Sequence, residues 1–502
     1  MLVALSGEGY AAAHNCGEYA VTHQRFSLVA LFCATLFASP ALLAINESQL
    51  PDIGTAGVSA LTIDREIAYG ESFMRFARAQ LPIIDDPVLD EYLDDLGQRL
   101  VSHAENVRFP FTFFLIHDDT INAAAFLGGK VKVHSGLFLN AENENELAGV
   151  LAHEISHITQ RHIARYMESQ TKQTPVAIAG LVGSIALAII NPSVGVAAMQ
   201  TMLGINVQTA ISYTRDNEFE ADRIGMKLLY EAGFDPMGMV TFFQKLAATS
   251  RYASKPPEML LTHPLPETRI SEARNRAANY PKVRKHDDLN FSFAKARIQV
   301  RYSNETADGM LGWFDKELVR NPQQAGLLYG KALALLALKR QAEAEPIIQQ
   351  LANRYPDNPF ILDTQTDIDM ANNQVPRAVQ RLESWLQRQP DNEVVIFNLV
   401  SALQQQSQYA RAIKILDLYV RNHPDNVLGW STLADLYRQT SDQTNLHIAW
   451  GEHQALLGDY PHAIDELTQA RATTQDRLTL ARLDARLVQF EEAKRQDESL
   501  RQ

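Results

Sequence analysis

The spacing of apolar residues predicts helices and short strands in the first half of the chain. Apolar side chains recur every three or four positions over 63–78 and over 87–102, which predicts two helices with one buried face. The apolar and aromatic run 111–116 predicts a buried strand. Lys and Val alternate over 130–134, which predicts a half-exposed strand. Such a strand can present an open edge, to which an extended peptide adds through main-chain hydrogen bonds.

Small and polar residues precede this second strand. Asn122 and Ala123 follow the first strand, and Gly128 and Gly129 predict a turn or a bulge just before the second. We therefore expect Asn122, Ala123, Gly128 and Gly129 to frame a peptide-binding edge. The alternative from sequence alone is an ordinary edge strand without a ligand.

The second half of the chain is periodic. Three sets of positions recur at intervals of 34 residues: Pro322, Pro356, Pro390 and Pro424; Ala344, Ala378 and Ala412; Ile348, Leu382 and Leu416. Small residues let paired helices approach closely, and the prolines end each second helix. The interval is that of the tetratricopeptide repeat, which predicts an all-α solenoid. After Pro424 the phase slips, because the next turn, at 458–463, comes late; the charged segment that follows is expected to cap the array.

Length and charge add two further expectations. A chain of 502 residues is too long for one ordinary core, and 46% hydrophobic residues are typical of a globular protein. The basic and polar stretch 282–286 places a domain boundary near 288, giving a first domain at 45–287 and a repeat domain at 288–502. The formal net charge of −13, without a basic cluster, argues against nucleic acid as a partner.

The N-terminus predicts export. Arg25 precedes the apolar run 26–38, and small residues follow up to Ala44, which is typical of a secretory signal peptide over residues 1–44. Residues 1–24 contain no Lys or Arg, so we expect the true start to lie after Met1. Cys16 and Cys33 are the only cysteines, so the exported chain would have neither disulfides nor thiol chemistry.

The stretch 176–190 is almost wholly apolar. Fifteen residues cover only about 22 Å as a helix, which is too short to span a bilayer. Two interpretations remain: a buried helical hairpin, or an apolar plate beside the site that makes peripheral contact with a membrane or with unfolded substrate.

The chemistry centres on the sequence H-E-x-x-H at 153–157. His153 and His157 are four residues apart, so on a helix both imidazoles project from one face. That spacing suits two nitrogen ligands on one Zn²⁺ ion, and it places Glu154 beside the metal-bound water. A carboxylate there can take a proton from the water as it attacks a carbonyl. We expect this helix to run to about Glu168; the alternative is a surface helix with two solvated histidines.

A second segment offers a third ligand. Glu218 and Asp222 share one helix face among apolar neighbours, and buried carboxylates need a partner. A zinc ion would satisfy Glu218, and Asp222 could orient a ligating histidine. The alternative is a charged face paired with Arg215 and Arg223.

The other common zinc arrangement does not fit. It needs Gly at position 160 and His at 163, where this chain has Gln160 and Ile163. His162 would lie on the wrong side of a continuous helix to join His153 and His157. Two histidines and a glutamate therefore fit best.

A loop stiffened by prolines holds a further histidine. Pro264 and Pro266 restrict the backbone beside His263. Three roles are open for His263: an electrophile for the tetrahedral intermediate, a fourth ligand that closes the zinc site, or an ordinary loop residue. Arg269, a few residues later, is a further candidate for supporting the site.

Together these features resemble one family. The H-E-x-x-H, the E-x-x-x-D at 218–222, the Asn122-Ala123 and Gly128-Gly129 segment and the His263-Pro264 loop are similar to zinc metallopeptidases related to the CAAX prenyl protease and the membrane heat-shock protease. A signal peptide and C-terminal repeats narrow the resemblance to the periplasmic group of that family. Many relatives carry Pro where this chain has Leu127.

The resemblance implies an α+β gluzincin-type domain, mostly helical with a small sheet, followed by the solenoid. It implies one Zn²⁺ on His153, His157 and Glu218, with Glu154 as the base. It also implies degradation of misassembled outer-membrane beta-barrel proteins and help in assembling others, with the repeats docking on the barrel-assembly machinery. The rival interpretation is a catalytically silent chaperone or scaffold that acts through its repeats.

Overall fold

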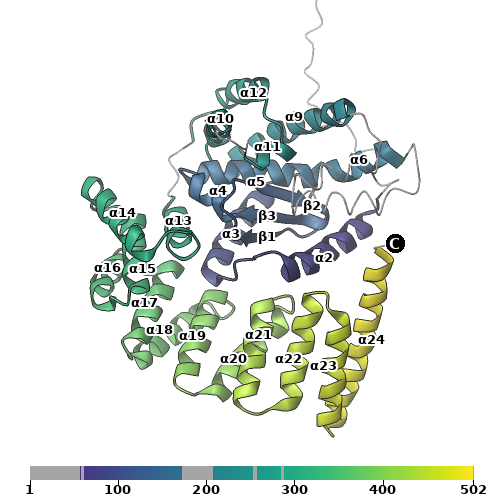
Figure 1. The fold of residues 1–502 in the computed structure, drawn as a ribbon, viewed down its shortest axis with the longest axis vertical. Coiled ribbons are helices and arrows are strands. Elements are labelled where there is room, and N and C mark those ends of the chain that lie inside the picture. The colour runs from purple at the N-terminus through teal and green to yellow at the C-terminus, as the bar shows by residue number, and fades with distance from the viewer. Residues whose placement is uncertain (1–56, 58–60, 172–206, 253–256, 284–287, 501–502) are drawn as a thin grey trace, which may run out of the picture. The chain divides into compact units, whose positions relative to one another are not determined.

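The computed structural model describes residues 57, 61–171, 207–252, 257–283 and 288–500 (Figure 1). The predicted signal peptide and the apolar stretch 176–190 lie outside these ranges, so both stay predictions. Within the described ranges, no helix combines the length and the apolar character that crossing a bilayer would require.

A small mixed sheet packed between helices forms the first part of the fold. Strand β3 lies in the centre, parallel to β1 and antiparallel to β2. The elements are α2 (Ile63–Gln80), α3 (Pro87–Val101), β1 (Thr112–Ile116), β2 (Ala123–Phe126), β3 (Lys130–His134), α4 (Ser135–Asn140), α5 (Glu144–Thr159), α6 (His162–Thr171), α9 (Val207–Glu231), α10 (Met237–Tyr252), α11 (Met259–Thr262) and α12 (Glu267–Ala277). The helices predicted over 63–78 and 87–102 are confirmed as α2 and α3.

Side chains at the helix starts explain where several helices begin. Asp86 caps α3 through hydrogen bonds from the backbone of Val88 and Leu89, with Pro87 in the first turn. Asn143 caps α5 by accepting from the backbone of Glu146. The start of the helix that carries H-E-x-x-H is therefore fixed locally by its own sequence.

The strand with alternating Lys and Val is the centre of the sheet, so its predicted half-exposure is wrong. Lys130 and Lys132 are buried, because α2 covers this face: Glu71 accepts a hydrogen bond from Lys130 Nζ at 2.7 Å. Helices α2 and α5 lie on opposite sides of the sheet (Figure 1). Strands β1 and β2 form the two edges. Ile83 bridges to Ile116 of β1, and β2 ends in a tight turn where Gly128 and Gly129 have φ of 67° and 79°.

Helix α5 is shorter than predicted. It ends at Thr159 rather than near Glu168, because Arg161 has a left-handed φ of 53° and turns the chain into α6. The Arg161 guanidinium is buried, 2.7 Å from Glu66 of α2. A buried ion pair thus fixes the break at the end of α5.

The rest of the chain is an all-α array. Its helices are α13 (Leu289–Arg301), α14 (Ala307–Arg320), α15 (Ala325–Ala337), α16 (Gln341–Arg354), α17 (Pro359–Ala371), α18 (Val375–Arg388), α19 (Glu393–Gln405), α20 (Tyr409–Asn422), α21 (Val427–Gln439), α22 (Gln443–Leu456), α23 (Tyr460–Thr473) and α24 (Arg477–Leu500). The turns inside successive helix pairs repeat at 34 residues, each with one left-handed residue: Lys339, Asn373, Ser407 and Ser441. The predicted fold class, a mostly helical domain with a small sheet followed by an all-α solenoid, is confirmed.

One apolar core joins the sheet domain to the first repeats. It continues from Ile84 to Val394 without a break at the predicted boundary near 288. Tyr92 of α3 packs edge-on against Phe360 of α17, with ring centres 6.2 Å apart. Phe138 of α4 stacks on Phe291 of α13 at 6.4 Å. The first repeats and the sheet domain therefore bury each other's apolar surface.

A buried polar network crosses the same junction. Arg297 of α13 donates to Asp86 at 2.7 Å and to Asp363 of α17 at 2.6 Å, and Tyr302 also donates to Asp86 at 2.9 Å. Burial favours a neutral Asp86, yet the Arg297 charge holds the pKa of Asp86 below its usual value. The cap of α3 is thus tied to the repeats through Arg297.

We expect Arg297→Met to lower the free energy of unfolding by about 3–5 kcal/mol, because Asp86 and Asp363 would stay buried without their cation. Urea unfolding followed by circular dichroism measures the change. Arg388 is the matched control, since its ion pair with Asp357 is exposed; Arg388→Met should cost less than about 1 kcal/mol. Equal losses in the two variants would contradict a special role for Arg297.

Candidate metal centre

Helix α5 presents both histidines and the glutamate of H-E-x-x-H to one site. The Nε2 atoms of His153 and His157 lie 3.1 Å apart, one helical turn from each other. His153 and Glu154 are buried, and His157 is partly buried. The predicted convergence of two imidazole nitrogens is therefore present.

Helix α9 adds a carboxylate. Glu218 Oε2 lies 3.4 Å from His153 Nε2, and Oε1 lies 3.3 Å from His157 Nε2. The two helices approach closely at Gly225, where an added Cβ would lie 3.0 Å from the carbonyl oxygen of Ala152. A larger residue at Gly225 would push Glu218 away from the histidines.

The loop after α11 adds a fourth donor. His263 Nδ1 lies 3.0 Å from Glu218 Oε1 and 3.3 Å from His153 Nε2. One ligand atom from each of His153, His157, Glu218 and His263 lies within 4.8 Å of the others, and within the described ranges this is the group that could hold a metal ion. Imidazole nitrogen with carboxylate oxygen is a typical donor set for a divalent transition metal, so the residues fit a metal.

A further carboxylate and an arginine hold these donors in place. Asp222 Oδ1 lies 3.0 Å from His153 Nδ1. Arg269, itself buried, donates to both oxygens of Asp222 at 2.7 and 2.8 Å and lies 2.8 Å from Glu218. It also donates to the carbonyl of Pro264 at 2.6 Å, which fixes the loop that carries His263.

The predicted alternative for the two carboxylates is wrong. Arg215 and Arg223 are exposed, whereas Glu218 and Asp222 are buried and face His153 and Arg269. The partner of the carboxylates comes from α12, which the local sequence around 218–222 does not reveal.

Glu154 links the site to the edge strand. Its Oε2 accepts a hydrogen bond from the backbone amide of Ala125 in β2 at 2.9 Å. Its Oε1 is buried 3.5 Å from His263 Nε2 and has no hydrogen-bond partner among the described residues. Burial raises the pKa of Glu154, while the nearby His263 and His153 lower it; the rise prevails. A buried carboxylate with an unused oxygen is well suited to accept a proton.

Charge pairing dominates the rest of the site. Burial disfavours a charged His153, yet hydrogen bonds to Asp222 and Glu218 raise its pKa to about 10. Burial also disfavours a charged Glu218, but His263 and His157 hold its pKa well below the usual value. Glu218 is therefore an anion, ready to bind a cation.

His162 lies closer to the site than the sequence predicts. His162 was placed on the wrong side of a continuous helix, but the break at Arg161 swings its Nδ1 to 2.9 Å from Nδ1 of His157. Its Nε2 lies 3.2 Å from Glu220, whose pKa falls to about 2 because of His162 and Arg165. His162 therefore contacts Nδ1 of His157, the ring nitrogen that is not directed at His153, and so orients this histidine.

The predicted peptide-binding residues lie at both ends of β2. Ala123 begins the strand, Asn122 precedes it, and the glycine turn at 128–129 follows it. Asn122 donates weakly to Glu258 at 3.5 Å, and the amide of Met259 in α11 donates to the carbonyl of Ile121 at 3.3 Å. The segment that carries His263 is therefore attached to the start of the edge strand.

Comparison with known proteins gives consistent matches. Residues 87–277 match the model of Peptidase family M48, and residues 327–358 and 369–436 match tetratricopeptide repeat models. A protein of Vibrio cholerae named putative beta-barrel assembly-enhancing protease is 50% identical over 67% of this chain and 71% of its own length. The beta-barrel assembly-enhancing protease of Escherichia coli is 44% identical over 71% of this chain and 74% of its own length.

We expect His162→Ala to weaken metal binding by about 10- to 100-fold, the usual cost of losing a group that orients a ligand. The measurement is a titration with Zn²⁺ against a chromophoric chelator. His447→Ala is the control, because His447 pairs with Glu466 inside the repeat array. Unchanged affinity in His162→Ala would contradict the role of His162.

Proposed function

The chain belongs to peptidase family M48 and, within it, to the beta-barrel assembly-enhancing proteases, and on this premise we propose that it is a zinc-dependent endopeptidase of the periplasm. The chain is a metalloendopeptidase; zinc, the roles of single residues and the compartment are the proposal. Its main support is the convergence of His153, His157 and Glu218 beside a buried Glu154 that contacts the edge strand.

His153, His157 and Glu218 would hold the zinc ion. The bound ion would supply a Lewis acid that polarises a carbonyl group and makes water more acidic. Asp222 fixes the orientation of His153 through Nδ1, and Arg269 fixes Asp222 and Glu218 together. With these supports the donors keep their positions before a substrate arrives, which reduces the cost of forming the site.

Glu154 is the proposed general base. Its Oε1, which no described residue engages in a hydrogen bond, would accept the proton of the attacking water, while Oε2 stays on the amide of Ala125. The same carboxyl would then return the proton to the leaving amine. Because Ala125 belongs to β2, a peptide that adds to this edge would bring its carbonyl group toward Glu154.

His263 is the proposed closing ligand. Its Nδ1 shares the donor cluster, so it would occupy a coordination position that substrate needs. Pro264 and the Arg269 contact hold the loop in place. Among the three roles predicted for His263, the ordinary loop residue has the least support from this geometry.

Clients and partners are proposed from the relatives. Their names refer to beta-barrel assembly, which supports outer-membrane beta-barrel proteins as substrates and as assembly clients. Tetratricopeptide arrays bind proteins, so the repeats would dock on the barrel-assembly machinery. The predicted signal peptide supports the periplasm. A silent scaffold is less well supported, because all three expected zinc ligands and the base are present together.

We expect Glu154→Gln to reduce peptide cleavage by at least about 100-fold, since the amide cannot accept the proton. Zinc content should stay near one ion per chain, because Glu154 is not a proposed ligand. A fluorogenic peptide assay and metal analysis of the same sample measure both. Cleavage at the wild-type rate would refute the role of Glu154.

The same variant separates proteolysis from chaperone activity. Assembly of an outer-membrane beta-barrel client should continue with Glu154→Gln if the repeats assist assembly without cutting. Loss of client assembly in Glu154→Gln would instead indicate that the protein acts on its clients only by cleaving them.

We expect His263→Ala to cleave peptide several-fold faster than the wild type, because removal of the imidazole opens a coordination position. Steady-state cleavage of a fluorogenic peptide measures the change. Slower cleavage would contradict the closing role and favour His263 as an electrophile. His423→Ala is the control, since His423 pairs with Asp391 in the array.

A further inference from the structure

The turns between successive repeats touch the peptidase in a row. At one turn Asn392 donates to the carboxylate of Glu91 in α3, at 2.9 and 3.0 Å. At the next turn, the carbonyl of Asp425 accepts from Arg78 of α2 at 3.1 Å. The array therefore contacts the peptidase well beyond the shared apolar core, by polar groups spaced one repeat apart.

The third contact lies where the repeat phase slips. Gly458, with φ of 77°, begins the late turn, and an added Cβ there would lie 3.2 Å from the Cβ of Arg75 in α2. Arg75 lies over the Tyr460 ring at 5.8 Å and forms an ion pair with Asp497 of α24 at 2.5 Å. Asp497 is buried and Arg75 is mostly buried. The end of the array, where the 34-residue interval is broken, therefore contacts α2 directly.

Residues about one turn before Arg75 in α2 contact the sheet and the edge-strand turn. An added Cβ at Gly70 would lie 2.4 Å from the carbonyl oxygen of Leu127, in the turn that ends β2. Glu71 pairs with Lys130 of β3 at 2.7 Å. One helix therefore contacts both the last helix of the array and the sheet that would receive substrate.

Helix α2 also reaches the end of α5. Glu66 pairs with the buried Arg161, at the break that brings His162 behind His157. A shift of α2 along its axis would disturb the edge-strand turn first, because the Gly70 contact leaves no space for movement.

We propose that α2 is a positioning helix for β2, and that the contact of Arg75 with Asp497 and Tyr460 anchors it. The proposal rests on the edge-strand role of β2 in the proposed function. Detachment of α24 would loosen α2 and weaken the binding of a peptide to β2. Because coupling between two sites is reciprocal, a peptide on β2 would in turn strengthen the contact of α24 with α2.

A protein that binds the array by displacing α24 would therefore lower the affinity for peptide. Loss of the Arg75 contact would act first through Gly70 on the turn that ends β2, and α2 provides no metal donor, so we expect the effect mainly in KM.

We expect Arg75→Glu to raise KM for a fluorogenic peptide about five-fold, the lower end of measured couplings between sites, with kcat nearly unchanged. The charge swap Arg75→Glu with Asp497→Arg should recover most of the loss. Recovery in the swap excludes a simple folding defect in the single variant.

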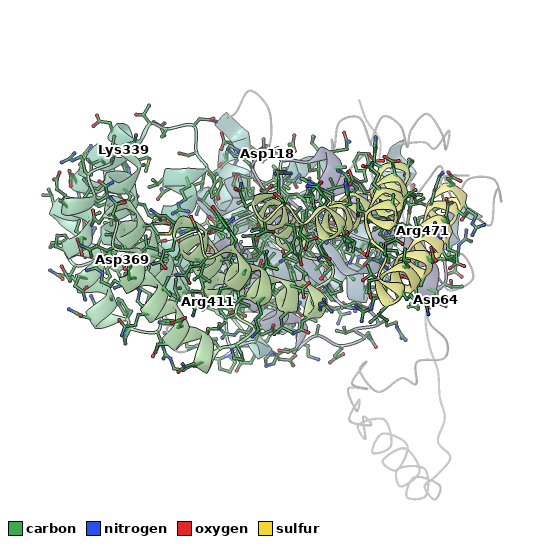
Figure 2. All side chains as sticks on the ribbon, turned by 90° about the horizontal axis from the view of Figure 1, so that it is seen from below. Asp64, Asp118, Lys339, Asp369, Arg411 and Arg471 are labelled. Carbon is green, nitrogen blue, oxygen red and sulfur yellow. The ribbon has the colours of Figure 1, made fainter. Side chains whose placement is uncertain are left out.

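Hydrogen exchange tests the contact without any cleavage. In Arg75→Glu the amides of α2 and of the turn 127–129 should exchange faster, and the swap should slow them again. The matched control is Arg471→Glu, because Arg471 pairs with Asp484 between α23 and α24, where both side chains are exposed. Figure 2 marks Arg471 at this end of the array, with Asp369 and Arg411 in earlier repeats.

Two results would overturn the proposal: unchanged KM and exchange in Arg75→Glu, or a swap that recovers neither. Equal effects in Arg471→Glu would also count against it, since that change does not alter the α2 contact. Absence of any peptide cleavage by the wild type would instead refute the proposed function, and hydrogen exchange would still decide on the α2 contact.

Discussion

The charge buried on α9 is the constraint on which the catalytic half depends. Glu218 and Asp222 lie inside the protein, where an unpaired carboxylate would cost several kcal/mol. Arg269 from α12 and His153 from α5 neutralise both. Three helices far apart in the sequence must therefore pack together before these charges are tolerated. The packing that solves this electrostatic problem also leaves four donor atoms facing one point.

The edge strand is tied to the same centre by direct bonds. Glu154 holds the amide of Ala125, and α11, which leads to His263, holds the carbonyl of Ile121. The place where a peptide would lie is thus bonded at one point to the proposed base and at another to the segment of the proposed closing ligand. The groups proposed for peptide binding, proton transfer and closure of the site are therefore direct neighbours.

That these side chains would come together could be predicted from the sequence because their spacing is local. A spacing of four residues, from His153 to His157 or from Glu218 to Asp222, places both side chains on one helix face wherever the helix packs. The repeat array was equally predictable, because its 34-residue interval can be seen in the sequence itself.

The errors concern features that depend on distant residues. Lys130 is buried because Glu71, 59 residues earlier in the chain, pairs with it, so the Lys and Val alternation over 130–134 misled the assignment of exposure. Helix α5 stops where Arg161 meets Glu66, 95 residues away, and without that break His162 seemed irrelevant. Asn392 and Glu91 are 301 residues apart. The residue pattern within one segment does not indicate which distant residue will pair with it.

The core that continues from the sheet domain into the first repeats has a consequence for engineering. Tandem helical arrays are often treated as cassettes, to be exchanged for others with a different binding preference. Here Phe291 and Phe360 are interior residues of the enzyme as much as of the array. A chimera would have to retain the first repeats, because their side chains complete this core; the second apolar cluster, which begins at Leu362, lies within the array alone.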